Sequence, residues 1–367
     1  MSEGADQGGV YTLTVLDVIE RTADACSFSF AVPDDAAEAF EYRPGQFLTL
    51  AVPSDLTGVA ARCYSLSSSP ESGEPPTITV KRTEDGYASN WLCDNLRPGD
   101  EIRVLPPEGI FTPKSLDHDL LLFAGGSGVT PIISIARHAL KLGDRKIVVF
   151  YANRDEKSVI FAEEWSELAR SYPERLQVVH WLESVQGLPT LEQLRAFAAA
   201  HRTYEAFVCG PAPYMKLVMT VLRELEFPRE RRHQEKFVSL GGNPFGDELA
   251  EAAAKAEIAE ADSDDEDEAV PAGPTEPVTL EVELDGQTYA FDDWSPAVKM
   301  LDFLESKGVK APFSCRAGEC SACAIRLLEG EVRMDNNDVL ELEDLDEGIR
   351  LGCQSHPLTE KVSVTYS

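Results

Sequence analysis

The sequence has little histidine, little positive charge and no long apolar run. It contains 6 histidines in 367 residues, and its 33 Lys and Arg are outnumbered by 64 Asp and Glu. The resulting net charge of −31 argues against nucleic-acid binding, which needs cations against phosphates. Since no run of about 18 apolar residues is present, we expect no membrane-spanning helix and no membrane partner.

The N-terminal stretch also lacks the features of an export signal. It reads MSEGADQGGVYTLTV, with neither a basic n-region nor an apolar h-region, so we expect no signal peptide and a cytoplasmic protein. In a reducing compartment the 8 cysteines are not expected to form disulfides. Three of them cluster tightly, which instead indicates a metal centre.

The length and the pattern of apolar residues predict several domains. A chain of 367 residues is too long for one ordinary core. Residues 9–113 show short alternating strands separated by turns such as Arg43-Pro44-Gly45, a pattern that favours a small antiparallel β-barrel. Residues 114–245 alternate apolar runs such as DLLLFAG and KIVVFYA with helical patterns, which predicts a parallel α/β sheet.

The last third of the chain divides into a linker and a small domain. Residues 246–276 hold 12 acidic residues and 1 basic residue, so we interpret them as an acidic linker, helical at most in its first half. The simpler explanation of this negative charge is that it keeps the protein soluble, and the alternative is that it attracts a basic partner. Residues 277–367 begin with two candidate strands and a helix, as expected for an α+β domain of the β-grasp type around the cysteines.

The cysteine spacing predicts an iron–sulfur cluster. Cys315, Cys320 and Cys323 give C-x4-C-x2-C, and Cys353 follows 30 residues later, which is the plant-type ferredoxin spacing for a [2Fe–2S] cluster. Structural zinc is less favoured because only one C-x2-C pair exists. A Rieske centre needs two histidine ligands, and His356 beside Cys353 has no matching partner.

Two segments of the barrel region have the residues needed to bind a flavin. In the first, Arg62 can pair with a pyrophosphate, Tyr64 can stack on the isoalloxazine ring, and the Ser65 hydroxyl can bond near the ring's N5. In the second, Gly86 and Ser89 can open a helix whose N–H groups bind phosphate. Alone, the first segment also fits an ordinary strand with a surface arginine.

Two segments of the α/β region predict a nicotinamide site. An apolar strand ends in a glycine-rich turn that allows a pyrophosphate close approach to the next helix, although Pro131 stands where the Rossmann fingerprint has its third glycine. Cys209-Gly210-Pro211 ends another strand, where Cys209 would lie beside the nicotinamide, unless it is simply a buried strand cysteine. The candidate nicotinamide-binding residues are Gly125, Gly126, Ser127, Gly128, Thr130, Cys209, Gly210 and Pro211.

The loop after KIVVFYA bears on the choice of nucleotide. It contains Arg154 and Asp155, at a position that usually meets the adenosine ribose. The acidic Asp155 disfavours a 2′-phosphate, whereas Arg154 could accept one. The sequence therefore favours NADH over NADPH.

Taken together, the three sets of motifs resemble the ferredoxin–NADP reductase superfamily, in its oxygenase-reductase branch with a C-terminal ferredoxin domain. The resemblance covers nearly the whole chain and includes RCYSLSSSP, VKRTEDGYASNWLCD, YANRDEKSVIF and PFSCRAGECSACA. It implies FAD, although a related branch uses FMN. It also implies that Lys81 and Arg82 lie near the flavin, and that Glu235 and Phe237 belong to a segment closing over it.

The expected function is that of a reductase that takes electrons from NADH and delivers them singly to a terminal oxygenase of the Rieske or di-iron type. We expect Cys209, Ser65 and Thr130 to be the catalytic residues, and the resemblance favours a steroid-ring hydroxylase as the acceptor. The alternatives are another acceptor, namely a phenylacetyl-CoA epoxidase-type or aromatic-ring oxygenase or a hybrid-cluster protein, and a redox sensor without turnover. The sequence does not indicate an oligomeric state.

Overall fold

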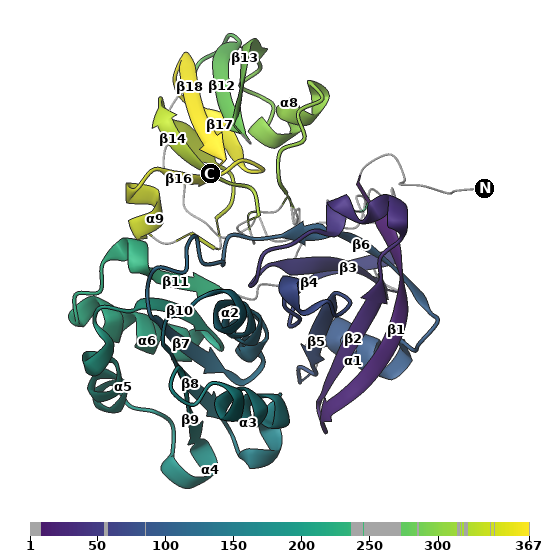
Figure 1. Cartoon of the computed structure of the whole chain (residues 1–367). Helices are drawn as coiled ribbons and strands as arrows, with labels where there is room; N and C mark the ends of the chain where they lie inside the picture. Colours follow the sequence, from purple (N-terminus) through teal and green to yellow (C-terminus); the bar gives the residue numbers. More distant parts are fainter. Residues whose placement is uncertain are drawn as a thin grey trace. The chain divides into compact units, whose positions relative to one another are not determined.

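The chain folds into two compact units (Figure 1). The first comprises residues 1–52 and 63–237, and the second comprises residues 53–62 and 238–367. In this computed structural model the described residues are 9–54, 58–84, 86–235, 245, 273–284, 286–313, 316, 318, 322–337, 339–340 and 342–366. Most of the predicted acidic linker, residues 246–272, lies outside them.

The N-terminal part is an antiparallel sheet of six strands in the order β4-β3-β6-β1-β2-β5. Alternate side chains of β1, such as Leu13 and Val15, are buried, as expected for strands that cover one core. Gly45 makes a tight turn possible, because its φ is +95° and a Cβ there would collide with the carbonyl oxygen of Phe111. The strands are β1 (Tyr11–Thr22), β2 (Ala25–Ala31), β3 (Phe47–Ser54), β4 (Gly58–Ser65), β5 (Thr77–Lys81) and β6 (Glu101–Glu108).

In the described part of this region, one α-helix and three short 3-10 helices accompany the sheet. The helix α1 follows β5, and Gly86 occupies its N-cap position. The elements are α1 (Tyr87–Asn95), η1 (Asp34–Ala36), η2 (Glu38–Phe40) and η3 (Pro70–Ser72).

A parallel sheet of five strands follows, in the order β11-β10-β7-β8-β9. The inner strands with the sequences LLLFAG and IVVFYAN are nearly continuous apolar runs because helices cover both faces of the sheet (Figure 1). Leu120 and Leu122 belong to the cluster of buried apolar side chains that includes those of α2. Leu121 and Phe123, on the other face of the sheet, belong to the cluster that includes those of α6. The strands are β7 (Leu120–Gly125), β8 (Ile147–Asn153), β9 (Leu176–Leu182), β10 (Glu205–Cys209) and β11 (Arg232–Glu235).

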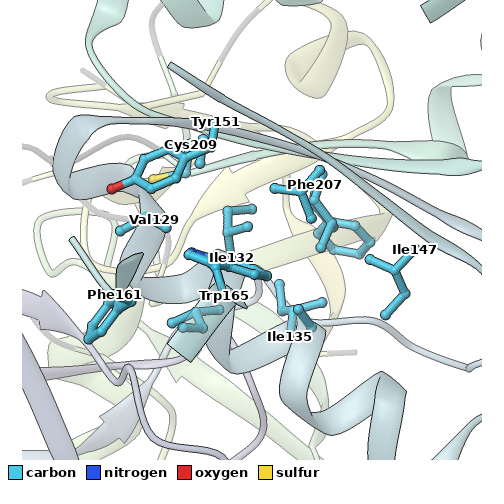
Figure 2. Close-up of a cluster of buried hydrophobic side chains, with 14 of the residues drawn as sticks. Val129, Ile132, Ile135, Ile147, Tyr151, Phe161, Trp165, Phe207 and Cys209 are labelled. Atoms are coloured by element: carbon cyan, nitrogen blue, oxygen red, sulfur yellow. The ribbon is translucent and has the colours of Figure 1, made fainter. Parts of the chain in front are cut away.

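The helices that cover this sheet are amphipathic or largely apolar. Figure 2 shows Val129, Ile132 and Ile135 of α2 packed among side chains that include Trp165 and Phe207. The helices are η4 (Gly126–Gly128), α2 (Val129–Leu142), η5 (Glu156–Ser158), α3 (Ala162–Ser171), α4 (Glu183–Gln186), α5 (Leu191–Ala198), η6 (Ala199–His201), α6 (Ala212–Glu224) and η7 (Arg229–Arg231).

Polar contacts join the barrel strands to the α/β part within the first unit. The Ser134 hydroxyl of α2 donates to the carbonyl of Ser68 at 2.6 Å, and His138 lies 2.7 Å from the Glu71 carboxylate. Arg21 of β1 forms an ion pair with Glu164 of α3. These contacts hold the predicted flavin and nicotinamide segments in one unit.

The second unit contains a mixed sheet in the order β13-β12-β18-β14-β16, with β12 and β18 parallel. The core of this unit includes Trp294 and Phe303. Strands β15 and β17 form a separate two-stranded sheet. The elements are β12 (Val278–Leu284), β13 (Gln287–Trp294), α8 (Met300–Ser306), β14 (Ala324–Glu329), β15 (Val332–Met334), α9 (Leu342–Asp346), β16 (Ile349–Leu351), β17 (Ser355–Pro357) and β18 (Lys361–Tyr366).

The predicted fold class is confirmed: an antiparallel flavin-type sheet, a parallel α/β sheet and a ferredoxin-type α+β domain. Among the described residues, none of the helices has the length and apolar character needed to cross a bilayer. The exact domain boundaries predicted from the sequence stay a prediction.

Candidate functional site

The glycine-rich turn and the Cys209 segment lie side by side at the carboxyl edge of the parallel sheet. Strands β7 and β10 are hydrogen-bonded neighbours, with Ala124 opposite Cys209. The turn η4 after β7 and the Gly210-Pro211 pair after β10 therefore emerge together. This is the edge where parallel α/β sheets bind nucleotides.

The glycines in these two segments are required by close packing of main chain against main chain. A Cβ on Gly128 would collide with the carbonyl oxygen of Cys209 and lie 2.5 Å from the amide nitrogen of Gly210. A Cβ on Gly125 would lie 2.8 Å from Pro211 Cδ. The edge is thus shaped by backbone, which leaves N–H groups accessible to a pyrophosphate and fits the predicted dinucleotide.

The remaining residues of the turn support its shape. Gly126 has a φ of +52° and its carbonyl accepts a hydrogen bond from the Tyr151 hydroxyl at 3.2 Å. The Thr130 hydroxyl donates to the carbonyl of Ser127 at 3.2 Å, and its side chain is buried. In the described structure Thr130 therefore closes the turn, and a catalytic role for it stays a prediction.

Cys209 is fully buried and belongs to the same apolar cluster as Val129 and Tyr151 (Figure 2). Glu235 of β11 lies opposite it in the parallel register. Burial raises the pKa of Glu235 to about 8, and burial together with Glu235 raises the pKa of the Cys209 thiol. Both groups are therefore neutral at pH 7. Phe237, predicted beside Glu235, lies outside the described residues.

The first predicted flavin segment, Arg62 to Ser65, forms the end of β4. Ser65 is buried, and its hydroxyl has no hydrogen-bond partner among the described residues. Such orphaned groups are rare in native proteins unless a ligand satisfies them, so this hydroxyl fits a flavin acceptor. Arg62 and Tyr64 are half-buried, and Arg62 donates to the carbonyl of Ala61 at 2.7 Å.

The second flavin segment is held mainly by its own contacts. Arg82 forms an ion pair with Asp94 at 2.7 Å and donates to the Asn90 side chain at 3.2 Å, so it anchors α1. The Ser89 hydroxyl accepts from the Thr83 amide at 3.0 Å, and a Cβ on Gly86 would lie 2.7 Å from Thr83 Cβ. The flavin-binding roles of Arg82, Gly86 and Ser89 stay predictions.

Lys81 connects the flavin strands with the nucleotide turn. It ends β5, forms an ion pair with Asp24 at 3.7 Å, and its ammonium lies 4.0 Å from the Cβ position of Gly126. Its charge thus lies next to the glycine turn, where an anionic pyrophosphate would bind.

The loop that was predicted to meet the ribose is capped by its own acidic residue. Asp155 accepts hydrogen bonds from the amide and hydroxyl of Ser158 at 2.9 and 2.8 Å, which lowers its pKa. Arg154 is exposed and forms an ion pair with Asp24 at 3.4 Å. The carboxylate of Asp155 is therefore fixed in place and negatively charged at neutral pH.

Two of the four predicted cluster ligands are described, and the fold brings their backbones together. Cys323 precedes β14 and Cys353 follows β16, which pairs with β14, and the Gly352 amide donates to the Cys323 carbonyl at 2.9 Å. Both side chains are buried. Cys315 and Cys320 lie outside the described residues.

The surroundings of these cysteines fit a cluster. The Tyr366 hydroxyl is buried with no hydrogen-bond partner in the described part of the chain, and burial together with Cys323 and Cys353 raises its pKa. The Tyr366 hydroxyl is a hydrogen-bond donor without an acceptor among the described residues, and it lies near Cys323 and Cys353. A bound cluster would bring sulfur atoms that could serve as that acceptor. Gly318, in the ligand loop, has a φ of +78°, and a Cβ there would lie 2.6 Å from the Asn336 carbonyl oxygen.

His356 is occupied by structural contacts. Its Nδ1 lies 2.9 Å from the carbonyl oxygen of Pro296, and its Nε2 lies 3.1 Å from the Asp335 carboxylate. Both ring nitrogens thus have protein partners, which agrees with a cluster held by cysteines.

Sequence reasoning missed Gln354. Its side chain is buried and contacts both Cys353 and the ligand loop. Its position next to a ligand cysteine was the only available signal, and glutamine there has no motif of its own.

Comparison with known proteins assigns all three parts of the chain. The oxidoreductase FAD-binding domain family matches residues 12–112, the oxidoreductase NAD-binding domain family matches residues 122–220, and the 2Fe-2S iron-sulfur cluster binding domain family matches residues 282–358. FAD-binding, NAD-binding and 2Fe–2S domains are therefore present, in the order that the sequence predicted.

Two relatives and one solved structure cover nearly the whole chain. The ferredoxin reductase component of 3-ketosteroid-9-alpha-monooxygenase from Rhodococcus rhodochrous is 53% identical over 96% of both chains. A component of 1,2-phenylacetyl-CoA epoxidase from Escherichia coli is 31% identical over 97% of both. The structure of phthalate dioxygenase reductase, at 22% identity, matches with a TM-score of 0.55 over 97% of this chain and 98% of that one, which supports the fold.

Proposed function

The chain belongs to the family of monooxygenase ferredoxin reductase components, and on that premise we propose that it delivers electrons from NADH to the terminal oxygenase of a 3-ketosteroid 9α-hydroxylase, an enzyme of the Rieske type. It is an NAD(P)H-dependent oxidoreductase with domains for FAD, a nicotinamide nucleotide and a [2Fe–2S] cluster. The 53% identity that extends over 96% of both chains carries the choice of oxygenase.

A second candidate acceptor is supported by a weaker likeness. The epoxidase component from Escherichia coli is 31% identical, so an oxygenase of the phenylacetyl-CoA epoxidase type is the runner-up. The substrate of the oxygenase never meets this chain, and only the docking partner distinguishes the two.

We assign domain boundaries and ligands that follow the predicted ones. The flavin domain spans residues 9–113, the nicotinamide domain 114–245, the acidic linker 246–276 and the ferredoxin domain 277–367. The cluster ligands are Cys315, Cys320, Cys323 and Cys353. The pairing of β14 with β16 supports the assignment of the last two.

The flavin would be held by Arg62, Tyr64 and Ser65, with Lys81 near the pyrophosphates. When bound, FAD accepts two electrons together and releases them one at a time, which matches a two-electron donor to one-electron acceptors. The orphaned hydroxyl of Ser65 supports this assignment, because a flavin ring atom would give it the partner it lacks.

Cys209 and Glu235 would form the apolar wall against which the nicotinamide lies. Because burial keeps both groups neutral at pH 7, they offer the nicotinamide ring an uncharged surface to pack against. Glu235 holds a proton on its carboxyl group up to about pH 8. Gly125, Gly128 and Gly210 let the nucleotide backbone approach the sheet edge.

We infer a preference for NADH. A 2′-phosphate would meet the fixed carboxylate of Asp155, whose hydrogen bonds to Ser158 prevent it from turning away. The ion pair between Arg154 and Asp24 competes with a phosphate for the guanidinium.

Reconstitution with candidate oxygenases tests the proposed function. The purified holoprotein, NADH and a 3-ketosteroid oxygenase component should give steroid hydroxylation coupled to NADH oxidation. The same reductase with an acyl-CoA epoxidase component should support far less turnover. Equal or better coupling to the epoxidase would overturn the proposed partner, and absence of NADH oxidation with ferricyanide would overturn the enzymatic function itself.

Substitution of Cys209 tests the role of this wall. Cys209→Ala should slow flavin reduction by NADH in stopped flow while FAD stays bound, because the nicotinamide loses the surface that orients it. Cys26→Ala, another buried cysteine of the first unit, is the matched control and should leave the rate unchanged. An unchanged rate in Cys209→Ala would contradict the assigned role.

A further inference from the structure

The side chain of Gln354 contacts the sulfur of one proposed cluster ligand and the backbone of the ligand loop at once. Its amide nitrogen lies 3.6 Å from Cys353 Sγ and 2.6 Å from the carbonyl oxygen of Arg316. An NH₂ group has two protons, so one can be directed to each acceptor. Arg316 lies between the proposed ligands Cys315 and Cys320.

The orientation of this amide is fixed by the chemistry of its partners. Its oxygen accepts a hydrogen bond from the Lys299 ammonium at 3.1 Å, and an ammonium can only donate. The Arg316 carbonyl can only accept, so it must face the nitrogen. The amide therefore cannot flip, and its N–H groups stay directed toward the sulfur and the loop.

The backbone and charges around Gln354 hold the arrangement rigid. The backbone N–H of Gln354 donates to the carbonyl of Leu351 at 2.9 Å, and the backbone carbonyl of Gln354 accepts from the N–H of Asp335 at 3.1 Å. Lys299 is in turn paired with Asp335 at 3.4 Å. Only 2% of Gln354 is exposed to solvent, so water does not compete for its hydrogen bonds.

The loop on the other side is equally anchored. The guanidinium of Arg316 forms ion pairs with Glu305 and, at 3.1 Å, with Asp302, and it stacks on the Phe313 ring with 4.0 Å between guanidinium carbon and ring centroid. The main chain of Arg316 adopts a φ of +57°, unusual for a residue with a Cβ. The hydrogen bond from Gln354 reaches this strained position.

We propose that Gln354 is a positioning residue for the [2Fe–2S] cluster: it ties the ligand loop to the fourth ligand and donates a hydrogen bond to the Cys353 sulfur that raises the reduction potential. A hydrogen bond to a thiolate withdraws negative charge and stabilises the more negative, reduced form of the cluster. The inference rests on the proposed ligation by Cys353. It adds a residue that favours electron flow from flavin to cluster.

The test replaces the amide with a side chain of similar length that has no N–H group. In the full-length holoprotein, Gln354→Met should shift the midpoint potential of the cluster to a more negative value and change the electron paramagnetic resonance signal of the reduced state. Gln287→Met is the matched control, because Gln287 is exposed on β13 of the same sheet, and it should leave both unchanged. A Gln354→Met protein with a full cluster and the wild-type potential overturns the proposal.

A second measurement gives a result even if Gln354→Met does not fold. Gln287 and Gln354 are the only glutamines in residues 238–367. When side-chain amides of glutamine are labelled with ¹⁵N in the unmodified holoprotein, pulsed paramagnetic resonance of the reduced cluster should detect ¹⁵N coupling that persists in Gln287→Met. Absence of that coupling overturns the proposal, even where Gln354→Met loses its cluster. A wild-type protein with no reduced-cluster signal would instead contradict the ligand assignment, independently of which oxygenase it serves.

Discussion

The two units build their candidate sites from different parts of the chain. In the first unit the nucleotide edge is shaped by main chain, with Gly125 and Gly128 so closely packed that a methyl group does not fit without a shift of neighbouring atoms. In the second unit the atoms expected to hold the cluster belong to side chains, namely the cysteine sulfurs and the amide of Gln354 that contacts one of them, while Gly318 in the ligand loop is packed against main chain.

The difference follows from what each group needs. A dinucleotide is bound non-covalently along a broad surface, so backbone N–H groups and a close approach matter most. A cluster is bound through iron–sulfur bonds, so the identity of a few side-chain atoms decides whether it is present at all. We therefore expect the first site to be sensitive to added atoms and the second to exchanged ones.

Exchange of one sulfur for oxygen should have the largest effect. Cys323→Ser should abolish the cluster and reduce NADH-driven turnover of the oxygenase to background, because the hydroxyl of serine is a poor ligand for an iron–sulfur cluster. NADH-driven reduction of ferricyanide by the flavin should remain near wild type. The iron content and the visible spectrum give the first result, and a ferricyanide assay gives the second.

Cys26→Ser controls for the chemical change, since Cys26 lies on β2 of the first unit. Its cluster content should equal that of the wild type. Loss of both activities in Cys323→Ser would show that the two units do not function separately, which would break the comparison.

Addition of one methyl group to the nucleotide edge should have the second largest effect. Gly128→Ala places a carbon against the Cys209 carbonyl, and because backbone atoms must move, the strain is about 1–3 kcal/mol. The displaced edge should lose about 1.4 kcal/mol of NADH binding free energy, which raises the KM for NADH roughly tenfold. Stopped-flow reduction of the flavin at varied NADH concentrations measures this.

Gly143→Ala is the matched control at the other end of α2. Its closest protein atom would be the Ala139 carbonyl oxygen at 3.0 Å, and its backbone conformation is open to any residue. A wild-type KM in Gly128→Ala would show that the edge is not the place where the nucleotide approaches.

Glu235 is a buried acid of the first unit, and the pH dependence of the protein's stability should reveal its contribution. Glu235 has a pKa of about 8 in the folded protein and about 4.5 when unfolded, so the folded state holds an extra proton between these values. Its contribution to stability is fully present below pH 4.5 and is lost as the pH rises through 8. Each unit of pKa shift corresponds to about 1.4 kcal/mol.

Glu235→Gln removes that dependence. The melting temperature of the variant, followed by release of flavin fluorescence, should exceed that of the wild type at pH 8.5, and the two should differ less at pH 5.5. A difference that is equal at both pH values would mean that Glu235 is ionised in the folded protein.

The sequence predicted those parts of both sites that depend on spacing. The interval from Cys315 to Cys323 and the glycines around Gly128 are local patterns with a chemical reason. The sequence did not reveal which side chains engage each other across elements. Arg82 pairs with Asp94 and also contacts Asn90 of α1, and no local pattern predicted these two partners; its expected place near the flavin stays a prediction. Gln354 was missed for the same reason.

The smallest effect on the protein itself should come from Ser65, where a side chain of the first unit serves the cofactor alone. Its buried hydroxyl has no partner among the described residues, so it contributes desolvation cost without a hydrogen bond in the flavin-free protein. Ser65→Ala should leave the stability of the flavin-free form unchanged or raise it by about 1 kcal/mol. In the holoprotein the same change should slow flavin reduction by roughly tenfold, because a hydrogen bond worth about 1.4 kcal/mol near the ring is lost. Denaturant unfolding and stopped flow measure the two effects. If Ser65→Ala destabilised the flavin-free protein by several kcal/mol, the hydroxyl would belong to the scaffold, and the first site would depend on side chains as the second does.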